Sequence, residues 1–314
     1  SLRRPIVVTG YVGVVYERVG EGLYQRAGAD IVVANSPADA ETFSGRLDAI
    51  GYPSDAVVTE PLPFLDAPGG PRGSALTFAA QPDVPSRRAD RTYLVRRLAQ
   101  YARRHPECEV LLKVRGLPGE RLTHMEPYSY SRLVERLGTD VPANLRVVHG
   151  PMAETLDRTG LLVTVSSTAA VEAIHRGIPT AILTDFGVRE DLGNHFFAGA
   201  GCYAGFDEID EGVAPVADPS WAERHGLAGL PGGALAARVT ELRGRDLPPV
   251  RPYFSRRHSP VYLDRLLRVH GLESQPGRPG PHNVSRRLTR PLSRMLYRVG
   301  AGVIAPILRR LGEG

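Results

Sequence analysis

The sequence has almost no lysine and little cysteine. Of its 39 basic residues only Lys113 is lysine, and 34 glycines and 27 prolines accompany this bias. Such a composition is typical of a GC-rich genome, so the abundance of arginine does not by itself indicate phosphate recognition. The two cysteines, Cys108 and Cys202, are too few for a zinc-binding spacing or a disulfide framework, which favours a reducing compartment.

Long apolar runs are also missing. No run approaches the roughly 20 residues that a membrane-spanning helix needs, which excludes a multi-span membrane protein. The N-terminus lacks the layout of a signal peptide, so we expect a cytoplasmic location. A hydrophobic content of 42% and a charged content of 23% exclude wholesale disorder.

Positive charge is concentrated at one end of the chain. The net charge is +5, yet residues 284–314 hold seven arginines and one glutamate, which leaves −1 for the rest. Because the residues before this segment are close to neutral, we do not expect nucleic acid as a partner.

Short β-branched runs alternate with longer amphipathic stretches. The expected strands are Pro5–Thr9, Ile31–Ala34, Ala56–Thr59, Ala75–Ala80, Val110–Arg115, Leu145–Val148, Leu161–Val165 and Thr180–Leu183. The expected helices are Val14–Gly28, one that Ser36 caps and Pro37 begins, Arg88–His105, Glu126–Leu137, Pro151–Asp157 and Thr168–Arg176. This alternation predicts an α/β protein with parallel sheets covered on both faces.

A Gly/Pro-rich segment, Asp66–Ser74, divides the pattern into two domains. We expect residues 1–66 to form a partial N-terminal Rossmann-like domain and residues 74–245 a second one, ended by a helix at Leu235–Leu242. Three strands are few for a doubly wound domain, so we expect that residues preceding Ser1 are missing. Residues 246–282 are expected to be an extended linker with a short helix, and residues 283–314 a basic amphipathic helix.

The strongest functional signal is the turn from the strand at Leu161–Val165 into the next helix. Ser166, Ser167 and Thr168 follow this strand at the carboxyl edge of the sheet, where α/β proteins bind ligands. Three hydroxyls followed by two small alanines suit an anion such as phosphate. The alternative is that Ser166 only caps the helix.

These residues carry a resemblance. VSSTAAVEAIHRGIPTAILTDFG, residues 165–187, resembles the donor motif of GT-B glycosyltransferases, nearest to bacterial sialyl-, polysialyl- and Kdo-transferase-like proteins. The longer stretch Pro5–Trp221 resembles an actinobacterial family of GT-B-type glycosyltransferases, through Leu76–Pro82, Leu111–Arg115 and Val147–Pro151. The resemblance implies two Rossmann-like domains facing a cleft, with the acceptor on residues 1–66 and the nucleotide-sugar on residues 74–245.

The resemblance also implies the chemistry. A sugar would pass from a nucleotide-activated donor to an envelope polysaccharide or glycolipid, with no cofactor and no bound metal. Carried over by position, the three hydroxyls would hold donor phosphate. Gln81 and His149–Gly150 would line the nucleotide pocket, and Glu172 would contact the donor. Where a second glutamate is common, this chain has Thr180, and the usual His-Pro is His149–Gly150, which leaves donor sugar and stereochemistry open.

Other residues are candidates from their positions alone. Lys113 is a compact ammonium that could reach a phosphate, although an exposed strand-end lysine or a role for Arg115 is equally compatible. Asn194 and His195 could bind hydroxyls or act in catalysis, and the alternative for His195 is a loop histidine bonded to backbone. Glu17 is a candidate general base, with placement in a first helical turn as the alternative.

A glycine loop and the tail complete the candidates. Gly10 and Gly13 bracket a loop after the first strand, facing donor or acceptor. Residues 283–314 could lie on an anionic membrane surface, which would make the protein peripheral at the inner face of the plasma membrane, or could pack across the N-terminal domain. Two other functions fit this sequence: a nucleotide-sugar epimerase-like enzyme, and a non-catalytic nucleotide-binding module with a docking tail.

Overall fold

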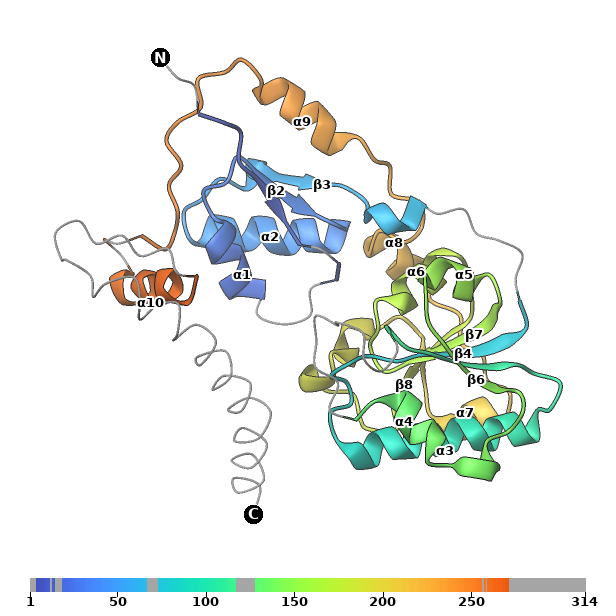
Figure 1. Cartoon of the computed structure of the whole chain (residues 1–314). Coiled ribbons are helices and arrows are strands. Elements are labelled where there is room, and N and C mark those ends of the chain that lie inside the picture. Colours follow the sequence, from blue (N-terminus) through green and yellow to red (C-terminus); the bar gives the residue numbers. More distant parts are fainter. Residues whose placement is uncertain are drawn as a thin grey trace. The chain divides into compact units, whose positions relative to one another are not determined.

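The computed structural model describes residues 4–11, 13–14, 19–66, 73–116, 128–255, 257 and 259–270 (Figure 1). One compact unit spans Ser1–Phe254. A second unit, Ser255–Gly314, contains helix α10 (Pro260–His270). None of the described helices is long and apolar enough to cross a bilayer. The predicted basic helix at residues 283–314 lies outside the described residues.

The first sheet is small and parallel. It contains β1 (Val8–Gly10), β2 (Ile31–Ala34) and β3 (Val57–Thr59), in that order. Its helices are α1 (Val19–Arg26) and α2 (Pro37–Ala49). We call this sheet with its helices the first lobe.

Helix α2 begins where the sequence predicts. The Ser36 hydroxyl accepts a hydrogen bond from the backbone N–H of Asp39 at 3.0 Å, and Pro37 occupies the first turn. A proline costs nothing there, because the first N–H groups of a helix have no intrahelical partner. The predicted cap and start are therefore confirmed.

The second sheet has six parallel strands in the order β6-β5-β4-β7-β8-β9. Their bounds are β4 (Ala75–Ala79), β5 (Val110–Lys113), β6 (Leu145–Val148), β7 (Thr159–Thr164), β8 (Thr180–Leu183) and β9 (Tyr203–Ala204). Counted from β4, this is the order 3-2-1-4-5-6 of a doubly wound fold. The predicted α/β class with parallel sheets is confirmed.

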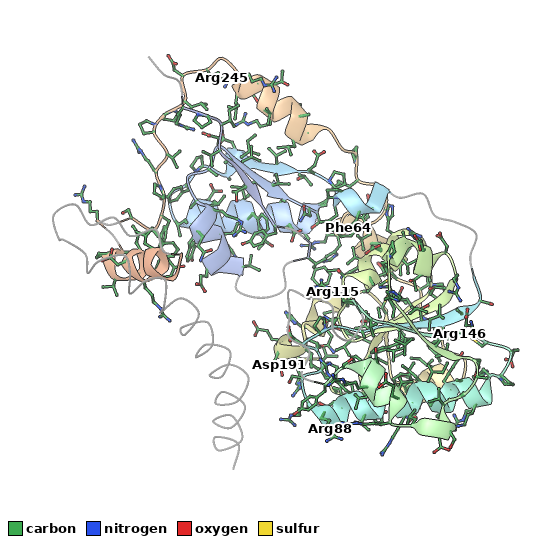
Figure 2. All side chains as sticks on the ribbon, in the orientation of Figure 1. Phe64, Arg88, Arg115, Arg146, Asp191 and Arg245 are labelled. Carbon is green, nitrogen blue, oxygen red and sulfur yellow. The ribbon has the colours of Figure 1, made fainter. Side chains whose placement is uncertain are left out.

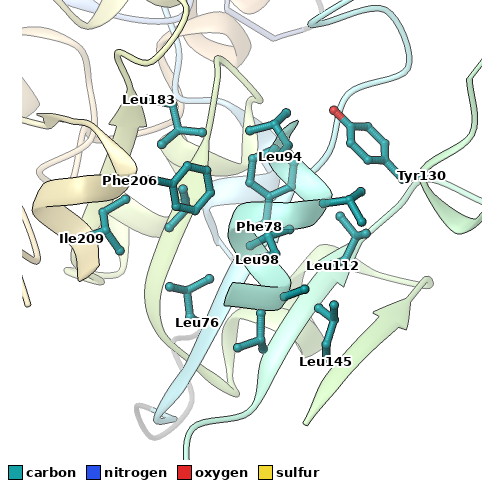
Figure 3. Close-up of a cluster of buried hydrophobic side chains, with 14 of the residues drawn as sticks. Leu76, Phe78, Leu94, Leu98, Leu112, Tyr130, Leu145, Leu183, Phe206 and Ile209 are labelled. Carbon is teal, nitrogen blue, oxygen red and sulfur yellow. The ribbon is translucent and has the colours of Figure 1, made fainter. Parts of the chain in front are cut away.

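Helices cover both faces of the second sheet, and together they form the second lobe (Figure 1). They are α3 (Arg88–Arg104), α4 (Tyr130–Glu135), α5 (Met152–Leu156), α6 (Ala169–His175), α7 (Phe206–Asp210) and α8 (Pro219–Arg224). The core has two layers because residues alternate along each strand. Leu76 and Phe78 pack with Leu94 and Leu98 of α3 on one face (Figure 3). Leu162 belongs to the cluster on the other face.

The chain then returns to the first lobe. Helix α9 (Ala234–Leu242) contacts β3, and the Glu60 carboxylate accepts hydrogen bonds from the backbone N–H groups of Gly233 and Leu235 at 2.8 and 2.9 Å. This differs from the expectation that the helix ends the second domain. The amphipathic pattern indicates that one face is buried, but not which sheet buries it.

Candidate functional site

The second sheet has a topological switch point between β4 and β7. These strands pair in parallel, and the chain leaves β4 toward β5 on one side and β7 toward β8 on the other. In doubly wound folds ligands bind in the crevice outside the carboxyl ends of the strands at such a point. Gln81 follows β4 and Ser166 follows β7, so two predicted site residues lie there.

Ser166 is sealed in this crevice. Its side chain is 1% exposed, and its hydroxyl donates to the carbonyl oxygen of Leu192 at 2.5 Å. The Gln81 amide lies against it: Oε1 accepts from the Ser166 N–H at 3.0 Å, and both Oε1 and Nε2 lie 3.2 Å from the Ser166 Oγ. The sequence predicts this hydroxyl as a phosphate ligand. In the structure this hydroxyl instead contacts Leu192 and Gln81 of neighbouring loops and is closed off from solvent. Ser166 does not cap the helix either, because the N-cap position of α6 is Thr168.

Ser167 and Thr168 are more accessible. The Ser167 hydroxyl accepts from the N–H of Ala169 at 3.3 Å, and its own N–H donates to Thr164 Oγ1 at 3.1 Å. Thr168 is half-buried, and within the described part of the chain its hydroxyl makes no hydrogen bond. A Cβ placed on Gly13 would lie 3.8 Å from the Thr168 methyl group. The predicted glycine loop and hydroxyl cluster therefore border each other.

The loop after β8 contains Asn194 and His195. Asn194 is fully buried; its amide donates to the carbonyl oxygens of Leu183 (3.3 Å) and Gly187 (2.9 Å), and its oxygen accepts from the N–H of Arg189 (2.9 Å). These contacts leave it no exposed atom for a substrate, contrary to the sequence argument.

His195 is placed differently from its neighbour. Its side chain is half-buried, and its buried Nδ1 has no hydrogen-bond partner among the described residues. A buried ring nitrogen without a partner costs free energy, so such a group is a candidate for a ligand or a proton.

Lys113 and Glu172 approach the same edge from β5 and α6. Lys113 is 5% exposed and its Nζ donates to the carbonyl oxygen of Val114 at 3.0 Å. Burial lowers the Lys113 pKa, and the Glu172 carboxylate partly offsets this. Burial raises the Glu172 pKa, with Arg176 and Lys113 opposing the shift. Two buried charges that compensate each other only in part are typical of a site that takes a further charged or polar group.

His149 and Gly150 are exposed to solvent, and Gly10 has a role in strand packing. The two exposed residues lie in the turn after β6. A Cβ at Gly10 would lie 3.0 Å from the Val33 Cβ, so this glycine permits the close approach of β1 and β2. Glu17 lies outside the described residues.

Arg115 follows β5 and is exposed. Figure 2 shows it on the same side of the second lobe as Asp191, in the loop after β8. Among the described residues no group of three or more His, Cys, Asp or Glu side chains could hold a metal ion. The predicted site residues of the second lobe therefore lie at the carboxyl edge of one sheet and include polar, basic and acidic groups.

Residues 1–242, more than half of the chain, match the family described as "Putative glycosyltransferase (DUF6716)". The chain belongs to this family. No curated protein matches the sequence.

Solved structures resemble this DUF6716 member only remotely. A TarM variant from S. aureus in complex with fondaparinux, alpha-GlcNAc-glycerol and UDP has 11% identity and a TM-score of 0.39, over 76% of this chain and 48% of its own. The glycotransferase of kitacinnamycin has 15% identity and a TM-score of 0.40, over 70% and 56%. The UDP-GlcNAc 2-epimerase from Neisseria meningitidis bound to UDP-GlcNAc has 14% identity and a TM-score of 0.41, and the match covers 69% of this chain and 62% of the epimerase chain. The chain thus spans about half to three fifths of the length of these proteins.

Sequence reasoning missed Arg91 of α3. In this DUF6716 member Arg91 is fully buried, and its guanidinium donates to the carbonyl oxygens of Pro85 (2.7 Å), Tyr128 (2.9 Å) and Pro82. A signal was available, because Arg91 occupies the same helical face as the buried Leu94 and Leu98. A charged residue on an apolar face indicates a buried polar contact.

A second missed feature is a small pocket lined by both lobes. Asp39 of α2 and His225, which follows α8, both line it. Burial raises the pKa of Asp39 and lowers that of His225, and each group's charge opposes the other's shift. The two ionisable residues lie far apart in the sequence, so no spacing could have indicated them.

Proposed function

We propose that this protein transfers a sugar from a nucleotide-activated donor to a glycan or glycolipid acceptor of the cell envelope. Membership of a family described as glycosyltransferases supports the reaction class. The observation that carries the donor site is the β4–β7 switch point, whose carboxyl edge holds hydroxyl, lysine and glutamate side chains.

The donor phosphates are assigned to the second lobe. Thr168 offers a half-buried hydroxyl, Ser167 stands beside it, and Lys113 supplies positive charge near the same edge. Hydrogen-bond donors held in a partly buried site stabilise developing negative charge more strongly than water does. In this proposal these groups, without a cofactor or metal, offset the charge on the departing nucleoside phosphate. Glu172 is assigned to the donor's hydroxyls, and exposed His149–Gly150 to the edge of the nucleotide pocket.

The reaction needs a base and a sugar-binding contact. The acceptor oxygen attacks the anomeric carbon, the carbon–oxygen bond to phosphate breaks, and the acceptor proton passes to a base. We assign Glu17 as this base from the sequence. His195 is assigned to the donor side, where its unpartnered Nδ1 could hold a sugar or phosphate oxygen. Gly10 and Gly13 would let the acceptor approach the backbone of the first lobe.

Membrane association belongs to the same proposal. A basic segment at residues 283–314 would hold the protein at the inner face of the plasma membrane, where lipid-linked acceptors are found. The spaced apolar residues and the positive charge of this segment would each bind the membrane weakly, and together they would give reversible rather than permanent membrane binding.

Ligand-induced stabilisation tests the donor site. Wild type is heated with CMP, UDP, GDP and CDP and their sugar derivatives. A ligand at about 100 times its Kd should stabilise the fold by about 2.7 kcal/mol. Thr168→Val keeps the shape but removes the hydroxyl, and we expect it to weaken binding about tenfold, as for a hydrogen bond to a charged group.

Thr240→Val is the matched control. Its hydroxyl donates to Ala236 within α9, away from the second sheet, so nucleotide binding should stay as in wild type. If no nucleotide stabilises the wild-type protein, the transferase proposal loses its donor site. Conversion of the nucleotide-sugar into its epimer without any acceptor, with the sugar still attached to the nucleotide, would instead favour an epimerase.

A further inference from the structure

Four hydrogen-bonding side chains form a continuous path over the carboxyl edge of the second sheet. We call Arg91, Gln81, Ser166 and Asn194 the edge network. Arg91 binds the carbonyl oxygens of the loop after β4, and Gln81 of that loop binds Ser166 after β7. Ser166 then reaches Leu192 in the loop after β8, and Asn194 fixes that loop internally.

The edge network also reaches the segment before α4. Arg91 Nη1 donates to the carbonyl oxygen of Tyr128 at 2.9 Å, and its side chain lies over the Tyr130 ring, 4.9 Å from the centroid. The path therefore joins chain segments that follow β5, β4, β7 and β8. These four strands are neighbours in the order β5-β4-β7-β8.

Burial makes this path stiff. Arg91 and Asn194 are 0% exposed, Ser166 is 1% exposed and Gln81 is half-buried, so water has little access to the contacts at Arg91, Ser166 and Asn194 unless the loops open. Hydrogen bonds in a low-dielectric interior strengthen one another, and a partly satisfied network is costly. The loops of this edge should therefore open together rather than one at a time.

We propose that Gln81 and Ser166 are positioning residues that bind three loops into one unit, which presents Thr168 and His195 to the nucleotide-sugar. Gln81 spans the switch point itself, joining β4 to β7. The identity of the ligand in this proposal rests on the proposed function. The coupling between the loops does not depend on that function. Neither residue needs to touch the donor to control its binding.

Hydrogen exchange measures the coupling without a ligand. Gln81→Met removes the hydrogen bonds to Ser166 and keeps the length of the side chain. We expect the amides of residues 186–194 to exchange about tenfold faster than in wild type, although the side-chain hydrogen bonds of Gln81 go to Ser166 and not to these residues. Gln81→Glu keeps an oxygen that can accept from the Ser166 N–H, so it should restore part of the protection.

Asn144→Leu provides a matched control in the same lobe. Its amide donates to the carbonyl oxygens of Ala102, His105 and Cys108 at 2.8–3.0 Å, near the amino end of β5. This variant should speed exchange around residues 102–108 and leave residues 186–194 unchanged. Should Gln81→Met unfold, Ser166→Ala, which removes the contact to Leu192, gives the same comparison.

The inference is overturned if both Gln81→Met and Ser166→Ala leave residues 186–194 within about twofold of wild-type exchange. Titration with UDP and the other nucleotides separates this result from the proposed function. If wild type binds none, the donor assignment fails while exchange still decides the coupling. If wild type binds one and Gln81→Met binds it equally tightly, the edge network does not position the donor site.

Discussion

At the scale of single residues, burial governs the two charges at the sheet edge. Burial is the largest cause of both shifts, lowering the pKa of Lys113 and raising that of Glu172. The charge on each opposes the shift of the other, so neutralising either leaves its neighbour less compensated. A bound phosphate would favour the charged form of Lys113, which links donor binding to the protonation of this edge.

Gly28, outside this sheet edge, has a backbone geometry and packing that predict the effect of adding a side chain. Gly28 follows α1 with φ +87°, and a Cβ there would lie 2.2 Å from the carbonyl oxygen of Arg251. Gly28→Ala therefore combines a strained backbone with a clash against backbone. We expect a loss of about 3 kcal/mol in the free energy of unfolding, measured by urea denaturation.

Gly51→Ala separates the two causes. Gly51 has φ +75°, but nothing lies within 4 Å of its added Cβ, so only backbone strain of about 1 kcal/mol applies. Equal losses in the two variants would mean that the segment at Arg251 does not pack against the end of α1.

The place of the three hydroxyls in the fold was predictable from sequence, but the orientation of their side chains was not. Three hydroxyls after a buried strand indicate the carboxyl edge of a parallel sheet, and they lie there. Whether a hydroxyl points to solvent or to a carbonyl oxygen depends on a loop that returns much later, as Leu192 does for Ser166. Asn194 shows a different limit: its side-chain partners are backbone groups of the preceding strand end and loop, and the residue types there do not indicate that the loop folds back onto this amide.

At the scale of elements, β-branched runs located the strands. The expected bounds of β2, β6 and β8 equal the observed ones, because each is a short run of mostly apolar residues bounded by polar or turn residues. Strand β9 has two residues and helix α7 five, too short for a periodic signal. Their positions are set by packing against β8 and α3, which only tertiary contacts specify.

Helix α3 depends on its buried arginine. Arg91→Met would keep the apolar contacts of the side chain but leave the carbonyl oxygens of Pro82, Pro85 and Tyr128 without this donor. Buried acceptors without partners are expensive, so we expect a loss of about 3 kcal/mol in urea unfolding. Arg96→Met, an exposed position on the same helix, should change stability by no more than about 0.5 kcal/mol. Equal effects would show that the buried contacts of Arg91 contribute nothing.

At the scale of the compact unit, the segment after α8 joins the two lobes. A Cβ at Gly226 would lie 2.9 Å from the carbonyl oxygen of Asn35, and Arg224 pairs with Glu41 of α2 at 2.8 Å. His225 lies between them, stacked on Trp221 with ring centroids 3.9 Å apart. The exposed ion pair contributes little, so close packing at Gly226 and His225 carries most of this contact.

This arrangement makes the contact sensitive to acid. His225 donates Nδ1–H to the carbonyl oxygen of Trp221 at 2.8 Å, and burial lowers its pKa, opposed by Asp39 and reinforced by Arg224. The unfolded chain therefore binds a proton more readily below the ordinary histidine pKa of about 6.5. The stability from neutral His225 is present above that pH and is lost as the pH falls through the folded pKa. The raised pKa of Asp39 has the opposite effect on stability at lower pH, because there the folded chain binds the proton more readily than the unfolded chain.

We therefore expect wild type to lose stability between about pH 7.5 and 5.5, and His225→Gln to lose less over the same interval, because glutamine keeps a donor for Trp221 but binds no proton. Urea midpoints at several pH values measure the slope. His149→Gln, at an exposed position after β6, should keep the wild-type slope. A slope unchanged in His225→Gln would mean that protonation of this ring does not weaken the contact between α2 and the segment after α8.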